Sequence, residues 1–490
     1  LVRTGERRRE LAVRAALGAG RTRLVRGLLV EGLVLALAGG ALGLLVGLAG
    51  IRGLVALQPG EIVPPDGLRL DPSVLAFTAA LSLATVLLFA LVPALRAGRL
   101  EAGETLKEGG RRAGGRFSGG RDGGLLVAGE VALAVLVVGG AALMGRSFLE
   151  LRDVDPGFRV ENRLTATISL PGSSYDSGEE IVGFYDALLD RLEGLPGVRS
   201  AAVTRSLPLA DTYWTSEFTA ESWGAGEYGV DVRHREVGEG YFRTLGVPLL
   251  RGRSFTREDR AGSPHVIVVN EALAEHYFPD EDPVGARIAF TREPSERSTW
   301  YTVVGVVGNE RQSSLRAEAG PEIVAPFRQD WTTTVRVVLH AEDAPAVLVE
   351  PLRREVRDLD PDLPVFRVRS LEGLFAESLA RERFLLALMG VFAATALLLA
   401  SLGIYGVTAR TTRRRTREIG VRIAVGARGR DVLGMVLARG GVMVGGGLAV
   451  GLAGAAVAGR ALESLLFGVS PTDPLTLGSV AVVLGCVGLL

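Results

Sequence analysis

The chain has 490 residues, too many for one ordinary hydrophobic core, so we expect two or more modules. Its 55 basic and 55 acidic residues give a net charge of zero, and we expect no nucleic-acid partner. The single cysteine, Cys486, excludes a disulfide within the chain. The 65 glycines are many for a soluble protein and ordinary for a mixed membrane protein.

A basic segment of thirteen residues occurs twice, at 7–19 (RRRELAVRAALGA) and at 415–427 (RTREIGVRIAVGA). At this offset of 408 (415 − 7), eight of the thirteen positions are identical. A repeat over such a distance indicates a duplicated unit. The identical pairs are Arg7/Arg415, Arg9/Arg417, Glu10/Glu418, Val13/Val421, Arg14/Arg422, Ala16/Ala424, Gly18/Gly426 and Ala19/Ala427.

Each basic segment is followed by a long apolar run, and about 20 such residues are enough to span a bilayer. We expect six spans, the last of them incomplete: 32–57, 74–95, 125–144, 384–407, 432–462 and 474–490. Small residues at every fourth position form a stripe that lets another helix approach closely. The stripe contains Gly39, Gly43 and Gly47 in the first copy and Gly447, Gly451 and Ala455 in the second.

Residues between the third and fourth spans are of a different kind, with charges, turns and short strands. Two strand–helix–strand patterns, at 164–204 and 335–368, predict two β-α-β units that form one subdomain. A strand-rich insert of about 206–330 separates them, with strands at 230–237, 266–269, 287–290 and 301–307 and a short helix at 270–277. The predicted fold is a multi-pass α-helical membrane protein with an α+β outer domain.

Short arginine-rich loops remain in the cytoplasm. Segments 1–26, 96–123 and 409–430 are all basic, and an even number of spans separates each from the next. The acidic loop 58–73 and the large domain then fall on the opposite side of the membrane.

The repeated basic segment has three interpretations. It is a flank that only sets orientation, an interfacial helix that binds anionic lipid, or a docking helix for a cytoplasmic partner. Both copies keep the same order of residues, and a flank that only sets orientation would not require this. Glu10 and Glu418 favour docking, because a lipid-binding face gains nothing from an acid.

The sequence from Arg417 to Ala427 resembles the cytoplasmic signature of MacB/FtsX-type permeases, the membrane subunits of type VII ABC systems. In that family an extracytoplasmic domain lies between the first two helices, and a coupling segment follows the second. The outer domain supports the resemblance at 240–255 (GYFRTLGVPLLRGRSF), 268–279 (VVNEALAEHYFP), 282–287 (DPVGAR) and 302–307 (TVVGVV). The resemblance implies that the outer domain is periplasmic and that the protein lies in the bacterial inner membrane.

The order of segments is that of two permease units on one chain, as in the large duplicated permeases first noted in acidobacteria. Because residue 1 stands within a motif and residue 490 within an apolar run, we interpret the sequence as incomplete at both ends. The expected division is 1–23, first coupling segment; 24–95, two transmembrane helices; 96–123, basic linker; 124–147, transmembrane helix; 148–383, periplasmic core domain; 384–408, transmembrane helix; 409–430, second coupling segment; and 431–490, two transmembrane helices.

The expected ATPase-coupling residues are Arg7, Arg9, Glu10, Arg14, Gly18, Arg415, Arg417, Glu418, Gly420, Arg422 and Gly426. The sequence has no Gly-x-x-x-x-Gly-Lys-[Ser/Thr] motif, so ATP is expected to be bound and hydrolysed by a separate subunit. No enzymatic activity, cofactor or metal is expected for this chain. Its four histidines lack metal-ligand spacing, and Ser206, Asp211 and His234 lack the sequence context of a catalytic triad. Glu31 and Glu130 are acids near or inside spans, and Glu130 is a candidate for a functional role.

The resemblance implies mechanotransmission, in which a cytoplasmic ATPase dimer presses on the coupling segments and moves the periplasmic domain. The first hypothesis is export or efflux of a periplasmic substrate, with membrane lipid, a periplasmic adaptor and an outer-membrane channel as further partners. The alternative is a regulator without transport, which activates a periplasmic cell-wall enzyme by the same movement.

Overall fold

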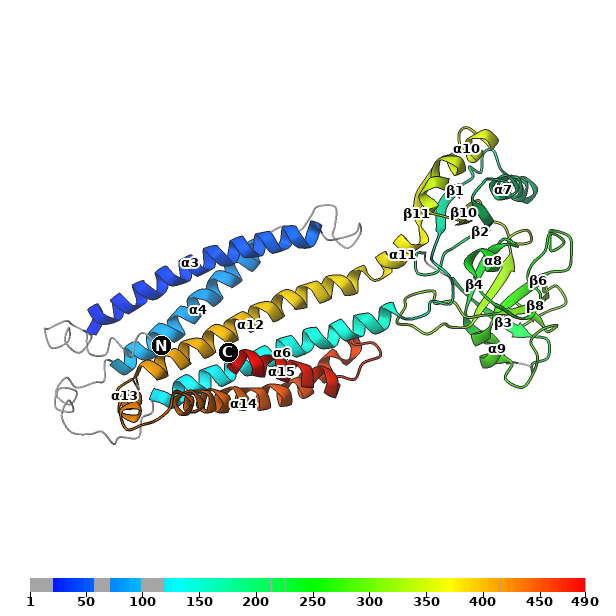
Figure 1. Ribbon diagram of the computed structural model, residues 1–490. Helices are drawn as coiled ribbons and strands as arrows, with labels where there is room; N and C mark the ends of the chain where they lie inside the picture. Colours follow the sequence, from blue (N-terminus) through cyan, green and yellow to red (C-terminus); the bar gives the residue numbers. More distant parts are fainter. Residues whose placement is uncertain are drawn as a thin grey trace. The chain divides into compact units, whose positions relative to one another are not determined.

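The computed structural model describes residues 21–56, 71–97, 119–211, 214–224, 226–414 and 416–489 (Figure 1). The chain divides into two compact units. A helical unit combines residues 1–148 with 381–490, and a unit of residues 149–380 contains the strands. Each unit is described by itself below.

The helical unit is built from long apolar helices. Within the described residues, four segments are long and apolar enough to cross a membrane: Gly32–Gly50, Gly124–Arg152, Ala380–Ala409 and Gly429–Leu465. Shorter apolar segments lie at Pro72–Ala84 and Pro474–Gly488. The helices are α3 (Arg21–Ala56), α4 (Pro72–Ala97), α6 (Gly119–Arg152), α12 (Ala380–Arg414), α13 (Thr416–Ala424), α14 (Gly429–Leu462) and α15 (Pro474–Leu489).

Several helices are longer than the apolar runs from which they were predicted. Helix α6 begins at Gly119, inside the expected linker 96–123, and α12 continues through the start of the expected coupling segment to Arg414. At about 1.5 Å per residue, the 35 residues of α12 extend over about 50 Å, well beyond the hydrocarbon core. Hydropathy locates the part of a helix that lipid covers, whereas the helix itself continues into water.

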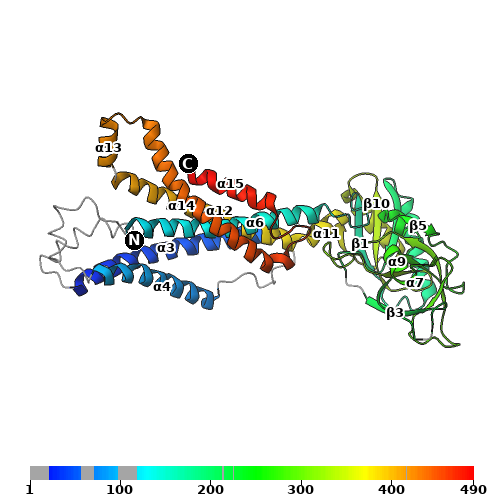
Figure 2. The same ribbon diagram turned by 90° about the horizontal axis from the view of Figure 1, so that it is seen from below.

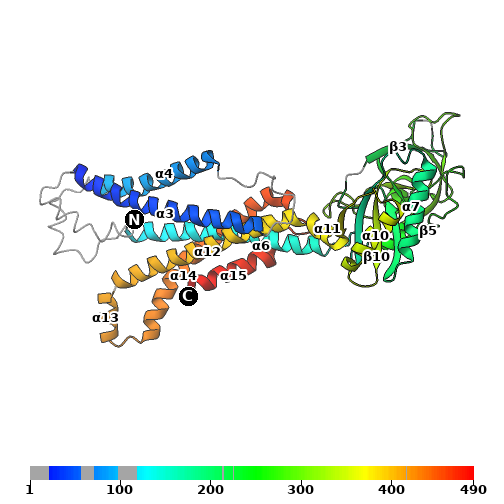
Figure 3. The ribbon, with the colours of Figure 1, turned by 90° about the horizontal axis from the view of Figure 1, so that it is seen from above.

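Helices α6, α12, α14 and α15 pack around one apolar core. The buried side chains are Val127, Val131, Ala134 and Val135 of α6, Ala400 of α12, and Val480 and Leu484 of α15, with Leu448 and Leu452 of α14 against them. Figures 2 and 3 show the four helices from two further sides.

The small residues of α14 allow its backbone to approach α6 closely. A Cβ atom added at Gly447 would lie 2.7 Å from the carbonyl oxygen of Ala128. One added at Gly451 would lie 2.6 Å from Val135 Cβ and 2.9 Å from the carbonyl oxygen of Ala132. Ala455 is also buried. Any larger side chain at these two glycines must push the helices apart.

The corresponding stripe of α3 has a different environment. A Cβ atom added at Gly39, Gly43 or Gly47 would find no atom within 4 Å among the described residues. Helix α3 packs against α4 elsewhere along its length. Helix packing by this first stripe therefore stays a prediction.

One ion pair fixes the end of α6 to the loop that precedes α15. Arg146 Nη1 lies 2.5 Å from Asp473 Oδ2. The same carboxylate oxygen accepts hydrogen bonds from the backbone N–H and the hydroxyl of Thr476, so Asp473 caps the first turn of α15. Ser147 Oγ also accepts the backbone N–H of Phe467, at 2.8 Å.

The strands of the second unit form one continuous sheet, with β5 (Leu249–Gly252) paired to β8 off the main path. The order is β11-β1-β10-β2-β4-β3-β7-β8-β6-β9. The bounds are β1 Arg163–Ser169, β2 Val198–Thr204, β3 Trp214–Ala220, β4 Gly229–Val237, β6 Val266–Asn270, β7 Arg287–Ala289, β8 Tyr301–Val307, β9 Glu322–Pro326, β10 Thr334–Ala341 and β11 Val365–Ser370.

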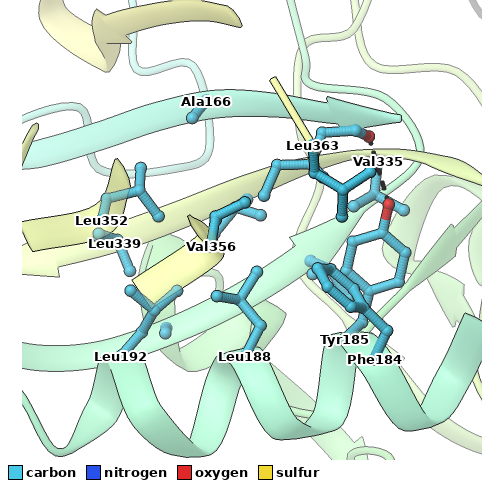
Figure 4. Close-up of a cluster of buried hydrophobic side chains, with 14 of the residues drawn as sticks. Ala166, Phe184, Tyr185, Leu188, Leu192, Val335, Leu339, Leu352, Val356 and Leu363 are labelled. Carbon is cyan, nitrogen blue, oxygen red and sulfur yellow. Dashed lines mark hydrogen bonds between the residues drawn. The ribbon is translucent and has the colours of Figure 1, made fainter. Parts of the chain in front are cut away.

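The strands of the two β-α-β patterns lie side by side in the order β11-β1-β10-β2, all antiparallel. This is the strand order of a split β-α-β fold. Helices α7 (Gly178–Glu193) and α10 (Val349–Leu359) pack on these strands. Figure 4 shows Phe184, Leu188 and Leu192 of α7 pointing toward Val356 of α10 and toward the sheet. The period of 3.6 residues in α7 produces this buried face.

The region between these patterns contains two further apolar cores. One lies around Tyr241 and Val268, and the other around Phe218 and Ile267. The structure adds elements that the periodicity did not indicate: β3, β5, β9 and the short helix α8 (Tyr241–Leu245). Helices α9 (Glu271–Tyr277) and α11 (Leu371–Ser378) and the 3₁₀ turns Pro345–Leu348 and Glu463–Leu465 complete the described elements.

A buried ionic cluster is centred on Arg235 of β4. The guanidinium of Arg235 contacts Glu310, and its Nε lies 2.8 Å from Glu322 Oε1. Tyr241 donates a hydrogen bond to Glu310 at 2.9 Å. Burial raises the pKa of Glu322, and the attraction of Arg235 opposes this shift. Because both carboxylates are buried, Arg235 is their necessary counter-charge.

We expect Gly451→Ala to destabilise the helical unit by about 1–3 kcal/mol, because its methyl group would overlap Val135 and Ala132. Gly446→Ala, on the same helix with no atom within 4 Å of the added Cβ, is the matched control. It should be neutral or stabilising by up to about 1 kcal/mol, since alanine favours helix. Thermal unfolding of the full chain in detergent measures both. Equal effects of the two substitutions would contradict the close approach.

We expect Arg235→Leu to cost about 3–5 kcal/mol of unfolding free energy, because it leaves two carboxylates buried without their cation. The control is Arg251→Leu, which removes an exposed arginine 3.5 Å from Asp282 and should cost at most about 1 kcal/mol. Denaturant unfolding of the full chain in detergent compares the two. A small effect of Arg235→Leu would contradict the role of Arg235 as the necessary counter-charge of the two carboxylates.

Candidate functional site

Helix α13 holds the second copy of the repeated basic segment, between α12 and α14. It has nine residues, Thr416–Ala424, and none of them is buried. Figures 2 and 3 both show it at the turn where the chain passes from α12 to α14. A helix this short is not stable alone in water, so the helices on either side must hold it in place.

The glycine of the repeat ends this helix. Gly426 has φ of 105°, a conformation that a residue with a side chain rarely adopts. Its N–H bonds to the carbonyl of Ile423 at 3.0 Å, and the N–H of Ala427 bonds to the carbonyl of Arg422 at 2.9 Å. This pair of bonds is the Schellman ending of a helix. The glycine in the repeat therefore has a structural reason, which is to turn the chain sharply into the next helix.

The charged residues of α13 form an exposed pair. Arg422 Nη2 lies 2.9 Å from Glu418 Oε1, one helical turn away. Arg422 Nη1 lies 3.3 Å from the sulfur of Met435 on α14. Exposed pairs of this kind contribute at most about 1 kcal/mol to stability. The contribution of this pair to stability is therefore too small to explain why an acid and a base stand at these two positions.

Apolar side chains are exposed on the same short helix. The exposed fraction is 59% for Val421, 55% for Ile423 and 84% for Val425. At 100° per residue, Val421 and Val425 share a face, whereas Ile423 lies on the opposite side. A flat lipid surface would cover only one of these faces. A cleft on another protein can cover both, and such exposed apolar groups mark interaction sites.

The expected coupling residues divide into two groups. Arg417, Glu418, Gly420, Arg422 and Gly426 lie on α13 or at its end, and their described side chains are exposed or half-buried. Arg7, Arg9, Glu10, Arg14, Gly18 and Arg415 lie outside the described residues. Sequence reasoning selected the charges and glycines and missed Val421, Ile423 and Val425. The available signal was that Val421 and Val425 are aliphatic in both copies.

Among the other candidates, Glu130 lies against α12. A Cβ atom added at Gly403 would overlap its Oε2, so this glycine makes room for the carboxylate. The side chain of Glu31 lies outside the described part. Two of the three residues considered as a catalytic triad have other partners: Asp211 binds Arg336, and His234 Nδ1 lies 3.3 Å from Ser216 Oγ.

Two family models match the chain. The MacB-like periplasmic core domain matches residues 131–359, and the FtsX-like permease C-terminal model matches residues 2–102 and 390–490.

Relatives with curated descriptions agree with these models. The pyoverdine export ATP-binding/permease protein PvdT of Pseudomonas putida is 29% identical over 248 residues, which are 48% of this chain and 36% of that protein. The macrolide export ATP-binding/permease protein MacB of Nitrobacter winogradskyi is 30% identical over 269 residues, 50% of this chain and 39% of that protein. The chain thus spans less than half the length of these two relatives.

Among solved structures, the periplasmic region of MacB from Actinobacillus actinomycetemcomitans is 15% identical, with a TM-score of 0.32. The match covers 46% of this chain and 96% of that one. The two family models together account for both the helical ends and the domain between them, and the chain belongs to the ABC transporter permeases of the MacB/FtsX type.

Proposed function

We propose that this chain is the membrane subunit of an export system, in which a separate cytoplasmic ATPase drives movement of the periplasmic domain. The observation that carries the proposal is α13, a short helix with no buried residue and with apolar side chains exposed on both sides. The membrane is the bacterial inner membrane, with residues 409–430 in the cytoplasm and residues 148–383 in the periplasm.

A partner that clasps α13 would move the ends of α12 and α14 together. Helix α12 is continuous from Ala380 to Arg414, so a displacement at its α13 end is transmitted along a stiff rod. The carboxylate of Glu418 gives the partner a specific polar group to recognise, in addition to the apolar contact. The ATPase dimer supplies the force, and this chain transmits it to the periplasmic domain without hydrolysing ATP itself.

We further propose that one duplicated chain takes the place of a permease dimer. The repeat and the match of the permease model to residues 2–102 and 390–490 both support two units. Each unit would present one coupling segment to one half of the ATPase dimer, as a two-fold interface requires. The names of the relatives support export as the function of the system. A periplasmic adaptor and an outer-membrane channel would then carry the substrate out of the cell.

Val425→Asp combined with Glu418→Arg should weaken co-purification with the cognate ATPase subunit and its stimulation, because it removes one of the two proposed docking segments. The two exposed positions contribute little to folding, so thermal stability should be unchanged. The matched control is Val347→Asp, which changes a valine with 67% exposure in the periplasmic domain. It should leave ATPase binding intact. Normal ATPase binding by the double variant would refute docking at α13.

Native mass spectrometry of the purified complex tests the duplication. We expect one permease chain with two ATPase chains, because each coupling segment serves one ATPase subunit. Two permease chains with two ATPase chains would show that the duplicated chain still pairs with a second copy, while leaving docking at α13 intact.

A further inference from the structure

Three potential metal ligands converge at one point of the periplasmic domain. His234 and Glu236 are two residues apart on β4, so their side chains leave the same face of the sheet. Strand β9 pairs with β4 in parallel, with Glu236 opposite Ala325, and Asp330 follows in the next turn. One nitrogen of the histidine and one oxygen of each acid all lie within 4.8 Å of one another.

The histidine is held in a fixed position. Its ring is stacked between Trp214 and Phe290, with ring centroids 4.9 Å and 4.5 Å away. Nδ1 lies 3.3 Å from Ser216 Oγ, an outer contact of the kind that orients metal-binding histidines. The side chain is about nineteen-twentieths buried, and Nε2 has no hydrogen-bond partner. Nε2 lies 3.9 Å from Asp330 Oδ2, on the side where the acids lie.

Glu236 is equally constrained. It is fully buried, and Arg205 Nη1 lies 3.1 Å from its Oε1. Its other oxygen, Oε2, is buried with no hydrogen-bond partner. A buried polar atom without a partner costs about 1–3 kcal/mol, so two of them in one cluster require an explanation.

We propose that His234, Glu236 and Asp330 bind a divalent first-row transition-metal ion of the Zn²⁺ type. One imidazole with two carboxylates is a donor set that suits zinc better than the all-oxygen sets of Mg²⁺ and Ca²⁺. The ion would satisfy both unpartnered atoms at once. The proposal departs from the expectation of no metal, because the ligands come together through sheet pairing and their sequence spacing has no metal-site pattern.

Modest movement would complete the geometry. Zinc–ligand distances of about 2.0–2.2 Å place tetrahedral ligand atoms about 3.3–3.6 Å apart, whereas His234 Nε2 lies 3.9 Å from Asp330 Oδ2. Asp330 is the ligand able to move, since its side chain is 48% exposed. Arg205 opposes the ion by its charge, but two carboxylates outweigh one guanidinium. It also holds Oε1 of Glu236 and leaves Oε2 without a hydrogen-bond partner.

Three protein ligands leave a fourth position open, as in zinc sites that bind water or an outside ligand. The bound ion would also tie β4 to the turn after β9. We therefore expect the ion to stabilise this part of the domain, with its open position available to a donor group of a periplasmic partner. This inference does not depend on the proposed export function.

The test uses the full chain in detergent, with purification tags removed and Cys486→Ser as background, since an exposed thiol is a zinc ligand in its own right. After dialysis against micromolar free Zn²⁺, we expect about one ion per chain by elemental analysis, and a rise in thermal stability. Asp330→Asn and His234→Gln should each lower the affinity about tenfold or more. His276→Gln, at an exposed histidine, is the matched control and should bind as the parent does.

Co²⁺ provides a second readout, because its visible absorption reports the coordination geometry. We expect a tetrahedral spectrum for the parent and for His276→Gln. Asp330→Asn decides the matter if His234→Gln fails to fold, since Asp330 is half-exposed. The proposal is overturned if the parent binds no zinc at micromolar concentration, or if Asp330→Asn retains the parent's stoichiometry and affinity. The latter would show that the ion binds adventitiously elsewhere.

Discussion

The close approach of α14 to α6 is the constraint on which the helical unit depends. Lipid tails are as apolar as leucine, so helices in a bilayer associate through close packing. Gly447 and Gly451 provide this packing, because their missing side chains bring backbone atoms of α6 into contact. With α14 fixed on α6, and α15 fixed through Arg146 and Asp473, the end of α14 that meets α13 has a firm support.

Periodicity predicted the elements that depend on local pattern. The apolar runs indicated the long helices, and the spacing of Phe184, Leu188 and Leu192 indicated the buried face of α7. Strands β3 and β5 were missed because they carry few apolar residues in alternation. The cluster of His234, Glu236 and Asp330 was not predictable, since it depends on the pairing of β4 with β9 and on a turn 94 residues away (330 − 236).

Three residues in the second copy of the repeated basic segment have a structural explanation. Gly426 turns the chain through a left-handed conformation, and Glu418 pairs with Arg422 on an exposed surface. Val421, Ile423 and Val425 are exposed within the described chain, and a flank that only sets orientation does not require exposed apolar groups. Docking of a partner explains the charges and the exposed apolar groups together. Orientation in the membrane explains only the charge.

The central claim is that the ATPase subunit contacts α13, and photo-crosslinking from position 425 tests it most directly. Val425 is 84% exposed, so a photoreactive residue there should not disturb the fold. The account predicts a crosslink to the ATPase from position 425 and none from position 347 in the periplasmic domain. An assembled complex that forms no crosslink from position 425, but forms one from another segment of the permease, would contradict it.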